Sequence, residues 1–315
     1  MEDHYLGIDA GGTKTRCVLG DATKVLASAT AGPIKIMRVS EAEAASNLSS
    51  LLQEVAARSG VPMGAITCTC VGLAGITVPR VEEWTRKALQ THLQGKLLIY
   101  GDEEIALDGA FFGTPGVLVI AGTGSNVVGR GMDGAVFHLG GWGPVLSDEG
   151  SGYWIGWQAV RALLRALDRG RETALLAAVL QQWQTTTLAG LVDLGNRVPG
   201  PDFSQLAPVV AQCADAGDAV AIEVLEAAGR ELGGMAAFAL QKVQASLDDA
   251  RTKEDKALLR LAFTGGVLSH VPQVRGALVA TVRSTVPQVE VLPGPADAAL
   301  GALWRARHSE KFAAR

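Results

Sequence analysis

Residues 8–16 read IDAGGTKTR, and a similar pattern returns at 120–126 as IAGTGSN. In both places an apolar run ends in a turn of glycine and threonine, and a second apolar run follows. One interpretation is a tight hairpin, because glycine permits sharp reversals of the chain. The other is a phosphate cradle, in which bare backbone N–H groups and a hydroxyl approach an anion closely. The first stretch alone favours the simple turn, so the rest of the chain must decide.

The elements around the two hairpins repeat in the same order, which indicates an internal duplication. Each half begins with three short strands joined by tight turns, and helices alternate with strands after them. The strands expected in the first half lie at 5–10, 14–20, 24–30, 65–73 and 96–102, with helices at 40–60, at 79–91 and from Glu103. The second half restarts with three strands from residue 116, and we expect helices at 149–168, 172–184, 203–216, 218–246 and 271–284, strands at 259–266 and 288–293, and a last helix from Asp297.

This order predicts an α/β fold of two duplicated lobes. We place the N-terminal lobe at 1–113, joined by a C-terminal helix at 297–315, and the C-terminal lobe at 114–296. Two such lobes would form a cleft in which both hairpins grip a nucleoside triphosphate, and closure of the lobes would exclude water.

The composition excludes several classes of protein. The 315 residues are 48 % hydrophobic and 19 % charged, enough apolar material for a real core. The net charge of −4 comes without a basic patch, so we expect no nucleic-acid partner. We also expect no membrane span and, since the N-terminus leads straight into a strand, no secretory signal. A cytoplasmic protein is the resulting expectation.

The four cysteines are predicted to be small buried hydrophobic residues. Cys68 and Cys70 lie two apart in a strand and face the same side, and no histidine or CxxC pair accompanies them as a zinc site would require. Other common motifs are absent as well. No P-loop occurs, and GTGSNVVG at 122–129 has its third glycine too late for a dinucleotide fingerprint.

Asp102 is the candidate catalytic base. It ends the apolar run KLLIYG, where a side chain would reach the edge of a sheet, and a carboxylate there can accept a proton from a hydroxyl that attacks a phosphoryl group. The alternative is that Asp102 only caps the next helix. Glu103 and Glu104 are weaker candidates, because acidic residues in a first helical turn are favourable in any case.

The segment GGWGPVLSDEGSGYWIGW at 140–157 is predicted to form a sugar-contacting loop. Asp148, with Ser151 three residues later, would alternatively be a simple helix cap. Trp142 could offer a flat apolar face to a sugar, whereas Trp154 and Trp157 are expected to pack in the core. The third glycine-rich site, FTGGV at 263–267, would either contact an adenine or ribose or form a plain strand-to-helix turn.

Together these segments resemble the N-acetylglucosamine kinases grouped with the BadF/BadG/BcrA/BcrD-type ATPases, which share the actin–hexokinase (ribonuclease H-like) fold. The matching segments span most of the chain: GIDAGGTKTR, VGLAG, the strand before Asp102, PGVLVIAGTGSN, GGWGPVLSDEGSGYWI and FTGGV. The combination of GTGSN with GGWG and SDEGS is specific, although each piece alone is not.

The resemblance implies an ATP-dependent kinase that uses Mg²⁺ to phosphorylate a hydroxyl of an amino sugar, with O6 of N-acetylglucosamine as the first expectation. It implies a homodimer, and it assigns Asp102 as the base and Asp9 as a ligand of Mg²⁺, directly or through water. The residues expected near ATP are Gly11, Gly12, Thr13, Lys14, Thr123, Gly124, Gly265 and Gly266. The residues expected to line the sugar are Asn126, Gly141, Trp142, Gly143, Asp148 and Lys35.

Lys35 departs from the family pattern, because relatives usually carry an asparagine in the loop AGPIKIMRVS at 31–40. A lysine cannot accept a hydrogen bond, but it could pair with an acidic substituent such as the lactyl carboxylate of N-acetylmuramic acid. It could equally be a surface lysine. The departure leaves N-acetylmuramic acid and glucosamine open as alternative substrates.

Two other functions remain open. One is the ATPase activator of a radical dehydratase, which would need cysteines for a shared iron–sulfur cluster. The other is a non-catalytic sugar sensor. We expect neither, because the sugar loop has no task in an activator and only eight residues precede Asp9, too few for the DNA-binding segment of a sensor.

Overall fold

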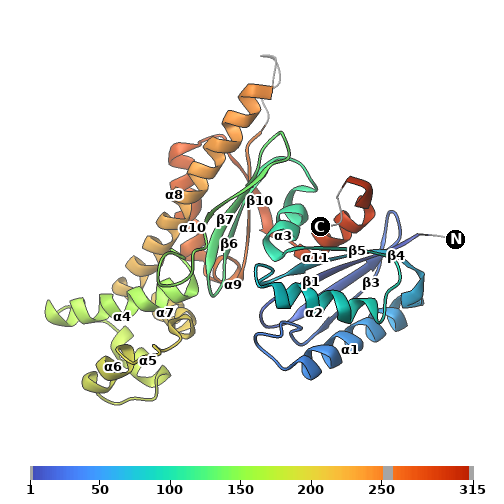
Figure 1. Cartoon of the computed structure of the whole chain (residues 1–315). Coiled ribbons are helices and arrows are strands. Elements are labelled where there is room, and N and C mark those ends of the chain that lie inside the picture. The colour runs from blue at the N-terminus through green and yellow to red at the C-terminus, as the bar shows by residue number, and fades with distance from the viewer. Residues whose placement is uncertain (1–2, 251–257, 312–315) are drawn as a thin grey trace. The chain divides into compact units, whose positions relative to one another are not determined.

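The protein is described by a computed structural model that covers residues 3–250 and 258–311, the side chains of 247–250 excepted. The chain divides into two compact units (Figure 1). The first unit is formed by Met1–Thr114 and Ala296–Arg315, and the second by Pro115–Pro295. The first unit is therefore built from both ends of the chain.

The elements of the first unit follow the expected order. Its strands are β1 (His4–Ala10), β2 (Thr15–Gly20), β3 (Val25–Ala31), β4 (Ile66–Leu73) and β5 (Lys96–Gly101). Its helices are α1 (Glu41–Ser59), α2 (Pro79–Gln90), α3 (Asp102–Phe111) and α11 (Ala298–Arg307), with short 3₁₀ turns at Met63–Ala65 and Ser309–Lys311.

The second unit carries more helices. Its strands are β6 (Gly116–Ala121), β7 (Ser125–Arg130), β8 (Val136–Gly140), β9 (Arg260–Thr264) and β10 (Glu290–Pro295). Its helices are α4 (Gly152–Asp168), α5 (Leu175–Gln182), α6 (Leu188–Gly195), α7 (Ala207–Asp215), α8 (Ala219–Ala250), α9 (Gly266–His270) and α10 (Pro272–Thr285), with a 3₁₀ turn at Phe203–Leu206.

The two sheets confirm the predicted duplication. The first has the order β3-β2-β1-β4-β5 and the second the order β10-β9-β6-β7-β8, which is the same order written from the other edge. In each sheet the first three strands of the unit pair antiparallel and the last two pair parallel. The α/β class and the repeated architecture therefore follow the sequence pattern.

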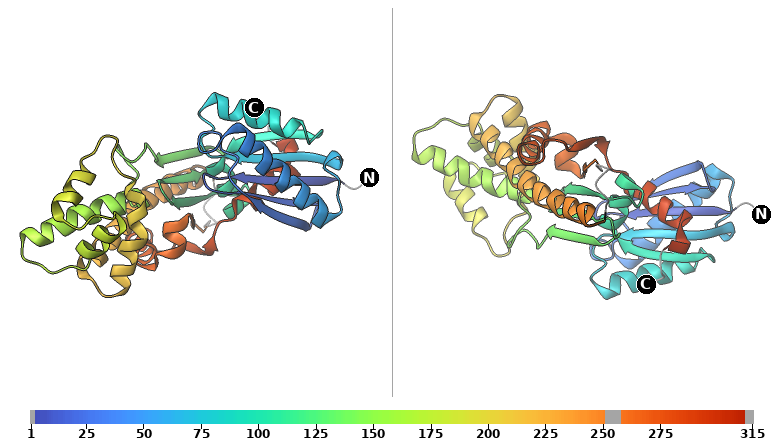
Figure 2. Two further views of the ribbon diagram at one scale, coloured as in Figure 1. Left: turned by 90° about the horizontal axis from the view of Figure 1, so that it is seen from below. Right: turned by 90° about the horizontal axis from the view of Figure 1, so that it is seen from above.

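Helices cover both faces of the first sheet (Figure 2). Leu6, Ile8 and Ala10 alternate along β1 and enter a core with apolar residues of α1 and α2. The opposite face packs against α11, where Gly7 lies so close that a Cβ on it would be 2.3 Å from the backbone nitrogen of Leu303. In the second unit one large core joins the sheet to α4, α7, α8 and α10.

Several helix bounds differ from the sequence prediction. The helix expected at 149–168 begins only at Gly152, because Asp148 (φ 63°) and Gly150 (φ 77°) hold left-handed backbone conformations that a helix cannot continue. The helix expected at 203–216 is divided into a 3₁₀ turn and α7, and α6 was missed. The helix expected to run to residue 315 ends at Arg307, and residues 312–315 lie outside the described range.

The cysteines agree with their prediction. All four cysteines are buried and unpaired, as predicted for small hydrophobic residues. Over the described parts of the chain, no helix has the length and apolar character needed to span a membrane.

The contact between α3 and α11 gives a test of the packing. A Cβ on Gly301 would lie 1.9 Å from the carbonyl oxygen of Ile105, so Gly301→Ala must push two backbones apart. We expect it to lower the free energy of unfolding by about 1–3 kcal/mol, the usual effect of overpacking. The measurement is a denaturant titration.

Gly276→Ala is the matched control. Gly276 also lies inside a helix, α10, but no atom lies within 4 Å of its Cβ position. This change should be neutral or raise the free energy of unfolding by about 0.5–1 kcal/mol, because alanine favours helix. Equal effects of the two changes would contradict the packing argument.

Candidate functional site

The first hairpin exposes its backbone. Gly11 and Gly12 connect β1 to β2, and neither has the positive φ that would make glycine necessary for the turn. A Cβ on Gly12 would meet no atom within 4 Å. Thr13 and Lys14 are exposed beside them. A Cβ on Gly11 would lie 3.2 Å from the carbonyl oxygen of Lys14, so the turn favours glycine there, whereas it does not demand glycine at position 12. The open backbone at Gly12 is the feature that the phosphate-cradle interpretation needs.

Asp9 is the penultimate residue of β1, just before this hairpin. It is partly buried, and its pKa is raised from 3.8 to about 6. Burial is the main cause, followed by the negative charges of Asp102 and Asp297, while Arg16 and Lys14 oppose the shift. Such a gathering of carboxylates lowers stability, and it is typical of sites that bind a cation or carry out chemistry.

Asp102 is the first residue inside α3, and the capping position belongs to Gly101. The alternative prediction, that Asp102 serves as the helix cap, is therefore wrong. Burial raises the pKa of the Asp102 carboxyl, the charge of Glu103 raises it further, and the first backbone N–H groups of α3 and the charge of Lys35 lower it. The result is a partly buried carboxylate with more affinity for a proton than a surface aspartate.

Lys35 lies near this carboxylate on an anchored turn. Its neighbour Ile34 is fully buried and donates its backbone N–H to Thr15 Oγ1 at 3.2 Å. The Cε and Nζ atoms of Lys35 lie 3.4 Å from the Cβ position of Gly75, in the turn after β4. Among the described residues no carboxylate forms an ion pair with Lys35.

The second unit brings its hairpin and the glycine-rich loop together. Asp148 Oδ2 lies 2.9 Å from the Cβ position of Gly124, so a side chain at 124 would strike the carboxylate. Gly141 lies equally close to Asn126, with its Cβ position 2.9 Å from the Asn126 Cβ. Thr123 accepts a hydrogen bond from the backbone N–H of Tyr153, which ties the hairpin to the start of α4. Residues that the sequence predicted to line the sugar are therefore neighbours within this unit.

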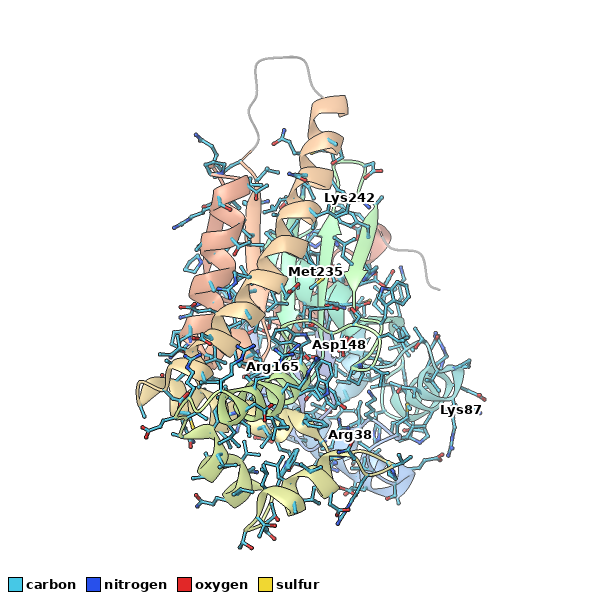
Figure 3. The ribbon with its side chains drawn as sticks, turned by 90° about the vertical axis from the view of Figure 1, so that its left-hand side faces the viewer. Arg38, Lys87, Asp148, Arg165, Met235 and Lys242 are labelled. Atoms are coloured by element: carbon cyan, nitrogen blue, oxygen red, sulfur yellow. The ribbon has the colours of Figure 1, made fainter. Side chains whose placement is uncertain are left out.

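Asp148, labelled in Figure 3, belongs to the loop that precedes α4. It is only 7 % exposed, has a φ of 63°, and accepts the backbone N–H of Gly143 at 3.2 Å. Burial raises its pKa, and the charge of Glu149 adds to the shift. Ser151, not Asp148, caps α4 by accepting the N–H of Trp154 at 3.1 Å. The capping alternative for Asp148 is therefore wrong, and positive φ in a non-glycine residue is common at functional sites.

The loop at 140–147 presents apolar side chains to its surroundings. Trp142, Val145 and Leu146 are 76 %, 89 % and 80 % exposed. Trp154 packs against the core as expected. The same expectation for Trp157 is wrong, because Trp157 is 39 % exposed and lies under the guanidinium of Arg161, 4.4 Å from the ring centroid.

The two glycines after β9, Gly265 and Gly266, have different structural roles. Gly265 has a φ of 95°, and a Cβ there would lie 2.3 Å from the carbonyl oxygen of Ala121, so the turn itself requires glycine. Gly266 has no atom within 4 Å of its Cβ position and leaves its backbone open. The predicted contact with a nucleotide stays a prediction at both positions, as does a nucleotide cleft between lobes.

Two residues of this site were missed in the sequence. Arg16 and Asp297 form an ion pair at 2.6 Å, and both charges act on Asp9. Arg16 could have been found, because it faces Asp9 across the predicted hairpin. Asp297 could not, since it lies near the other end of the chain.

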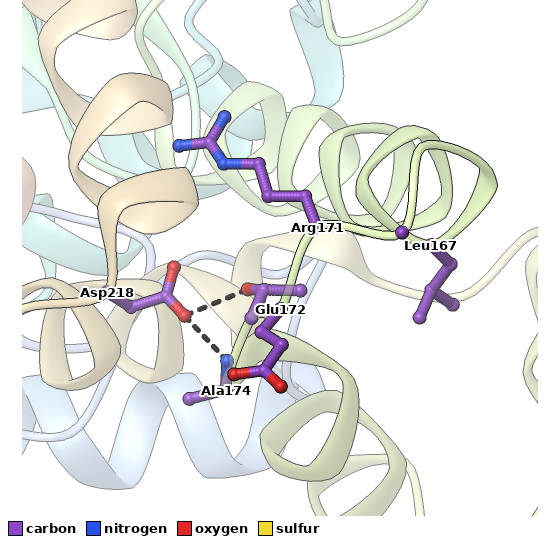
Figure 4. Close-up of a pocket in the computed structure, with 7 residues that line it drawn as sticks. Leu167, Arg171, Glu172, Ala174 and Asp218 are labelled. Atoms are coloured by element: carbon purple, nitrogen blue, oxygen red, sulfur yellow. Dashed lines mark hydrogen bonds between the residues drawn. The ribbon is translucent and has the colours of Figure 1, made fainter.

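A pocket of about 640 Å³ lies elsewhere in the second unit, between the segment that follows α4 and Asp218, the residue before α8 (Figure 4). Its polar groups serve the fold. Asp218 accepts hydrogen bonds from Thr173 Oγ1 and from the backbone N–H of Ala174, and Arg171 pairs with Glu223. No predicted site residue lines this pocket, so its volume does not make it the functional site.

The raised pKa of Asp9 predicts a dependence of stability on pH. Between pH 4 and 6 the folded protein holds a proton that the unfolded chain has released, so the free energy of unfolding should fall as pH rises through this range. Asp9→Asn removes the effect and should raise the free energy of unfolding at pH 7.5 by roughly 1–3 kcal/mol, with the gain vanishing toward pH 4.

Asp21→Asn serves as its control, with denaturant titrations at several pH values as the measurement. The pKa of Asp21 is lowered by hydrogen bonds from the backbone of Lys24 and Thr23, so this change should bring no such gain. A wild-type stability that rose between pH 4 and 6 with no gain in Asp9→Asn would disprove the electrostatic account.

Known proteins resemble the chain over nearly its whole length. A kinase from Clostridium acetobutylicum named for N-acetylmuramic acid and N-acetylglucosamine is 29 % identical over 309 residues, 96 % of this chain and 98 % of that protein. An N-acetyl-D-glucosamine kinase from Dictyostelium discoideum is 29 % identical over 326 residues, with 98 % of each covered. The solved structure of a candidate N-acetylglucosamine kinase from Chromobacterium violaceum matches with a TM-score of 0.68 and 27 % identity, over 96 % of this chain and 98 % of that one.

The family model for the BadF/BadG/BcrA/BcrD ATPases matches residues 6–306. That range includes both hairpins, Asp102, the loop at 140–148 and the turn after β9. The chain belongs to the BadF/BadG/BcrA/BcrD ATPase family.

Proposed function

We propose that the protein is an ATP-dependent kinase that phosphorylates an amino sugar, with O6 of N-acetylglucosamine as the principal acceptor. The proposal rests mainly on Asp102. Its carboxylate is partly buried and has a raised pKa, and it belongs to the same unit as a glycine hairpin with open backbone. The names of the Clostridium and Dictyostelium relatives support the amino-sugar class. N-acetylmuramic acid and glucosamine are the alternative substrates.

Asp102 acts as the general base in this proposal. It accepts the proton of the sugar hydroxyl while that oxygen forms a bond to the γ-phosphorus of ATP and the bond from phosphorus to the bridging oxygen breaks, which releases ADP. Backbone N–H groups of Gly11, Gly12, Thr123 and Gly124 bind the phosphates, and Thr13 and Lys14 add a hydroxyl and a positive charge. Gly265 and Gly266 lie against the nucleoside.

Mg²⁺ would be held by Asp9, directly or through water. Its hard carboxylate oxygens suit this ion, which is commonly bound by one or two carboxylates together with substrate phosphates. Within the described residues, no group of three or more His, Cys, Asp or Glu side chains could hold a metal ion by itself. This agrees with an ion that arrives with ATP, where it neutralises phosphate charge.

The second unit supplies the sugar contacts other than that of Lys35. Asn126 and the buried Asp148 carry the hydrogen-bonding groups, and the backbone of Gly141 and Gly143 allows close approach. The exposed ring of Trp142 offers an apolar face, as sugar sites commonly do. A homodimer and a cytoplasmic location are further parts of the proposal and rest on the family resemblance.

The direct test is a coupled assay of ADP release with ATP and Mg²⁺. The sugars are N-acetylglucosamine, glucosamine, N-acetylmuramic acid, N-acetylmannosamine and glucose, with a reaction lacking sugar as the blank. Release that depends on an amino sugar supports the proposal and identifies the substrate. ADP release at the same rate with and without every sugar would favour the alternative function, an ATPase activator of a radical dehydratase.

Asp102→Asn should lower kcat by about 10²–10⁴-fold, because the base is lost, while ATP binding measured by calorimetry stays unchanged. Glu103→Gln, at the next position of α3, is the matched control and should change kcat by less than about threefold. Wild-type turnover in Asp102→Asn would show that another group takes the proton.

Lys35→Asn tests the choice among sugars. If the ammonium pairs with an acidic substituent, this change should raise the ratio of kcat/KM for N-acetylglucosamine over N-acetylmuramic acid by about tenfold, the value of one partly buried charge pair. Lys87→Asn, which removes an exposed lysine paired with Glu83, should leave the ratio unchanged. An unchanged ratio in Lys35→Asn would show that Lys35 does not contact the sugar.

A further inference from the structure

Arg16 lies directly beside Asp9 on the sheet. The two residues are register partners in the antiparallel pair of β1 and β2, so their side chains lie on the same face. This is the face that α11 covers, because Gly7, two residues before Asp9, packs against the backbone of that helix. The guanidinium of Arg16 therefore belongs to the same surface as the proposed metal ligand.

Asp297 holds this guanidinium in place. Arg16 NH1 donates to Asp297 Oδ2 at 2.6 Å, while the other oxygen, Oδ1, accepts the backbone N–H of Leu300 and caps α11. The side chains of Arg16 and Asp297 are 36 % and 30 % exposed. Among the described residues only one guanidinium nitrogen of Arg16 takes part in an ion pair, which leaves further donors for an anion.

The fold does not depend on this pair. A partly exposed ion pair contributes little to stability. The helix cap uses the oxygen that Arg16 does not touch, and the far end of α11 is fixed by Arg307, which donates to the backbone carbonyls of Asp21 and Lys24 at 2.8 and 2.6 Å. A structural role alone therefore leaves the placement of Arg16 beside Asp9 unexplained.

The charges around Asp9 suggest a role for Arg16. The negative charges of Asp102 and Asp297 both act on Asp9, so a phosphoryl group that approaches Asp9 meets an acidic surface. Lys14 is exposed at the hairpin tip, whereas Arg16 is half-buried and preoriented by a carboxylate. A planar guanidinium with several donors suits phosphoryl oxygens.

We propose that Arg16 is a further catalytic residue, whose guanidinium binds the phosphoryl group during its transfer, and that Asp297 is its positioning residue. The inference rests on the proposed kinase function. No covalent step involves Arg16. It stabilises the charge on the phosphoryl oxygens, in the way that arginine residues accelerate other phosphoryl transfers.

The test compares Arg16→Gln, Arg16→Lys and Asp297→Asn with Arg80→Gln. Arg80 is the matched control, because it also belongs to the first unit and forms a 2.6 Å ion pair, with Glu41, but on an exposed surface. Asparagine at 297 keeps the helix cap and removes only the charge. Thermal melts of all four variants establish that each is folded.

Arg16→Gln should lower kcat by about 10²–10³-fold and leave the KM values for ATP and sugar within about threefold, since the contact forms mainly in the transition state. Arg16→Lys should keep part of the rate, and Asp297→Asn should lose roughly tenfold because its arginine is less well oriented. Arg80→Gln should match the wild type. A kcat of Arg16→Gln within about threefold of wild type would overturn the proposal.

A second readout separates catalysis from structure. MgADP with aluminium fluoride and the sugar imitates the phosphoryl group in transfer, and its binding is measured by the rise in melting temperature over MgADP and sugar alone. Arg16→Gln should lose this rise while it still binds MgADP. If kcat fell but the rise persisted, Arg16 would have only a structural role.

The proposed function and this inference fail in different ways. A wild-type enzyme that phosphorylates no sugar of the panel would overturn the proposed function. The fluoroaluminate measurement would then be made on MgADP alone, and its outcome in Arg16→Gln would still decide whether the guanidinium binds the transferred group.

Discussion

The contact of two helix backbones is the constraint on which the first unit depends. Gly109 of α3 and Gly301 of α11 have no side chains, so the helices approach until the Cβ position of Gly301 lies 1.9 Å from the carbonyl oxygen of Ile105. The start of each helix is set by its own cap, Gly101 for α3 and Asp297 for α11. The close approach keeps the two helices packed together against β1.

A buried ion cluster neutralises part of the negative charge of α3. Helix α3 contains Asp102 and three further acidic residues, and Arg305 of α11 pairs with two of them, Asp108 and Glu104. The guanidinium also lies 4.0 Å from the centroid of the Tyr100 ring. Arg305 neutralises these two acids, whereas Asp102, the proposed base, lies at the start of α3, where burial and the charge of Glu103 raise its pKa.

Local signals made much of this structure predictable. The hairpins, the start of α3 after β5 and the repeated strand order follow from glycine, cap and alternation patterns within short windows. The neighbours Gly124 and Asp148 were both chosen from sequence, but the contact between them depends on a positive φ at Asp148 that no local pattern announces. The pairs Arg16–Asp297 and Arg305–Asp108 join residues 281 and 197 positions apart, and periodicity carries no information about such pairing.

The discontinuity of the first unit has a consequence for biosynthesis. Helix α11 packs against β1, β2, β4 and α3, yet it leaves the ribosome only after the whole second unit has been synthesised. A nascent chain can complete the second unit, which is continuous from Pro115 to Pro295, while the face of the first sheet around Gly7 is still bare. The surface around Asp9 is complete only when α11 has been added, so a growing or prematurely terminated polypeptide has both glycine hairpins but lacks the ion pair of Arg16 with Asp297.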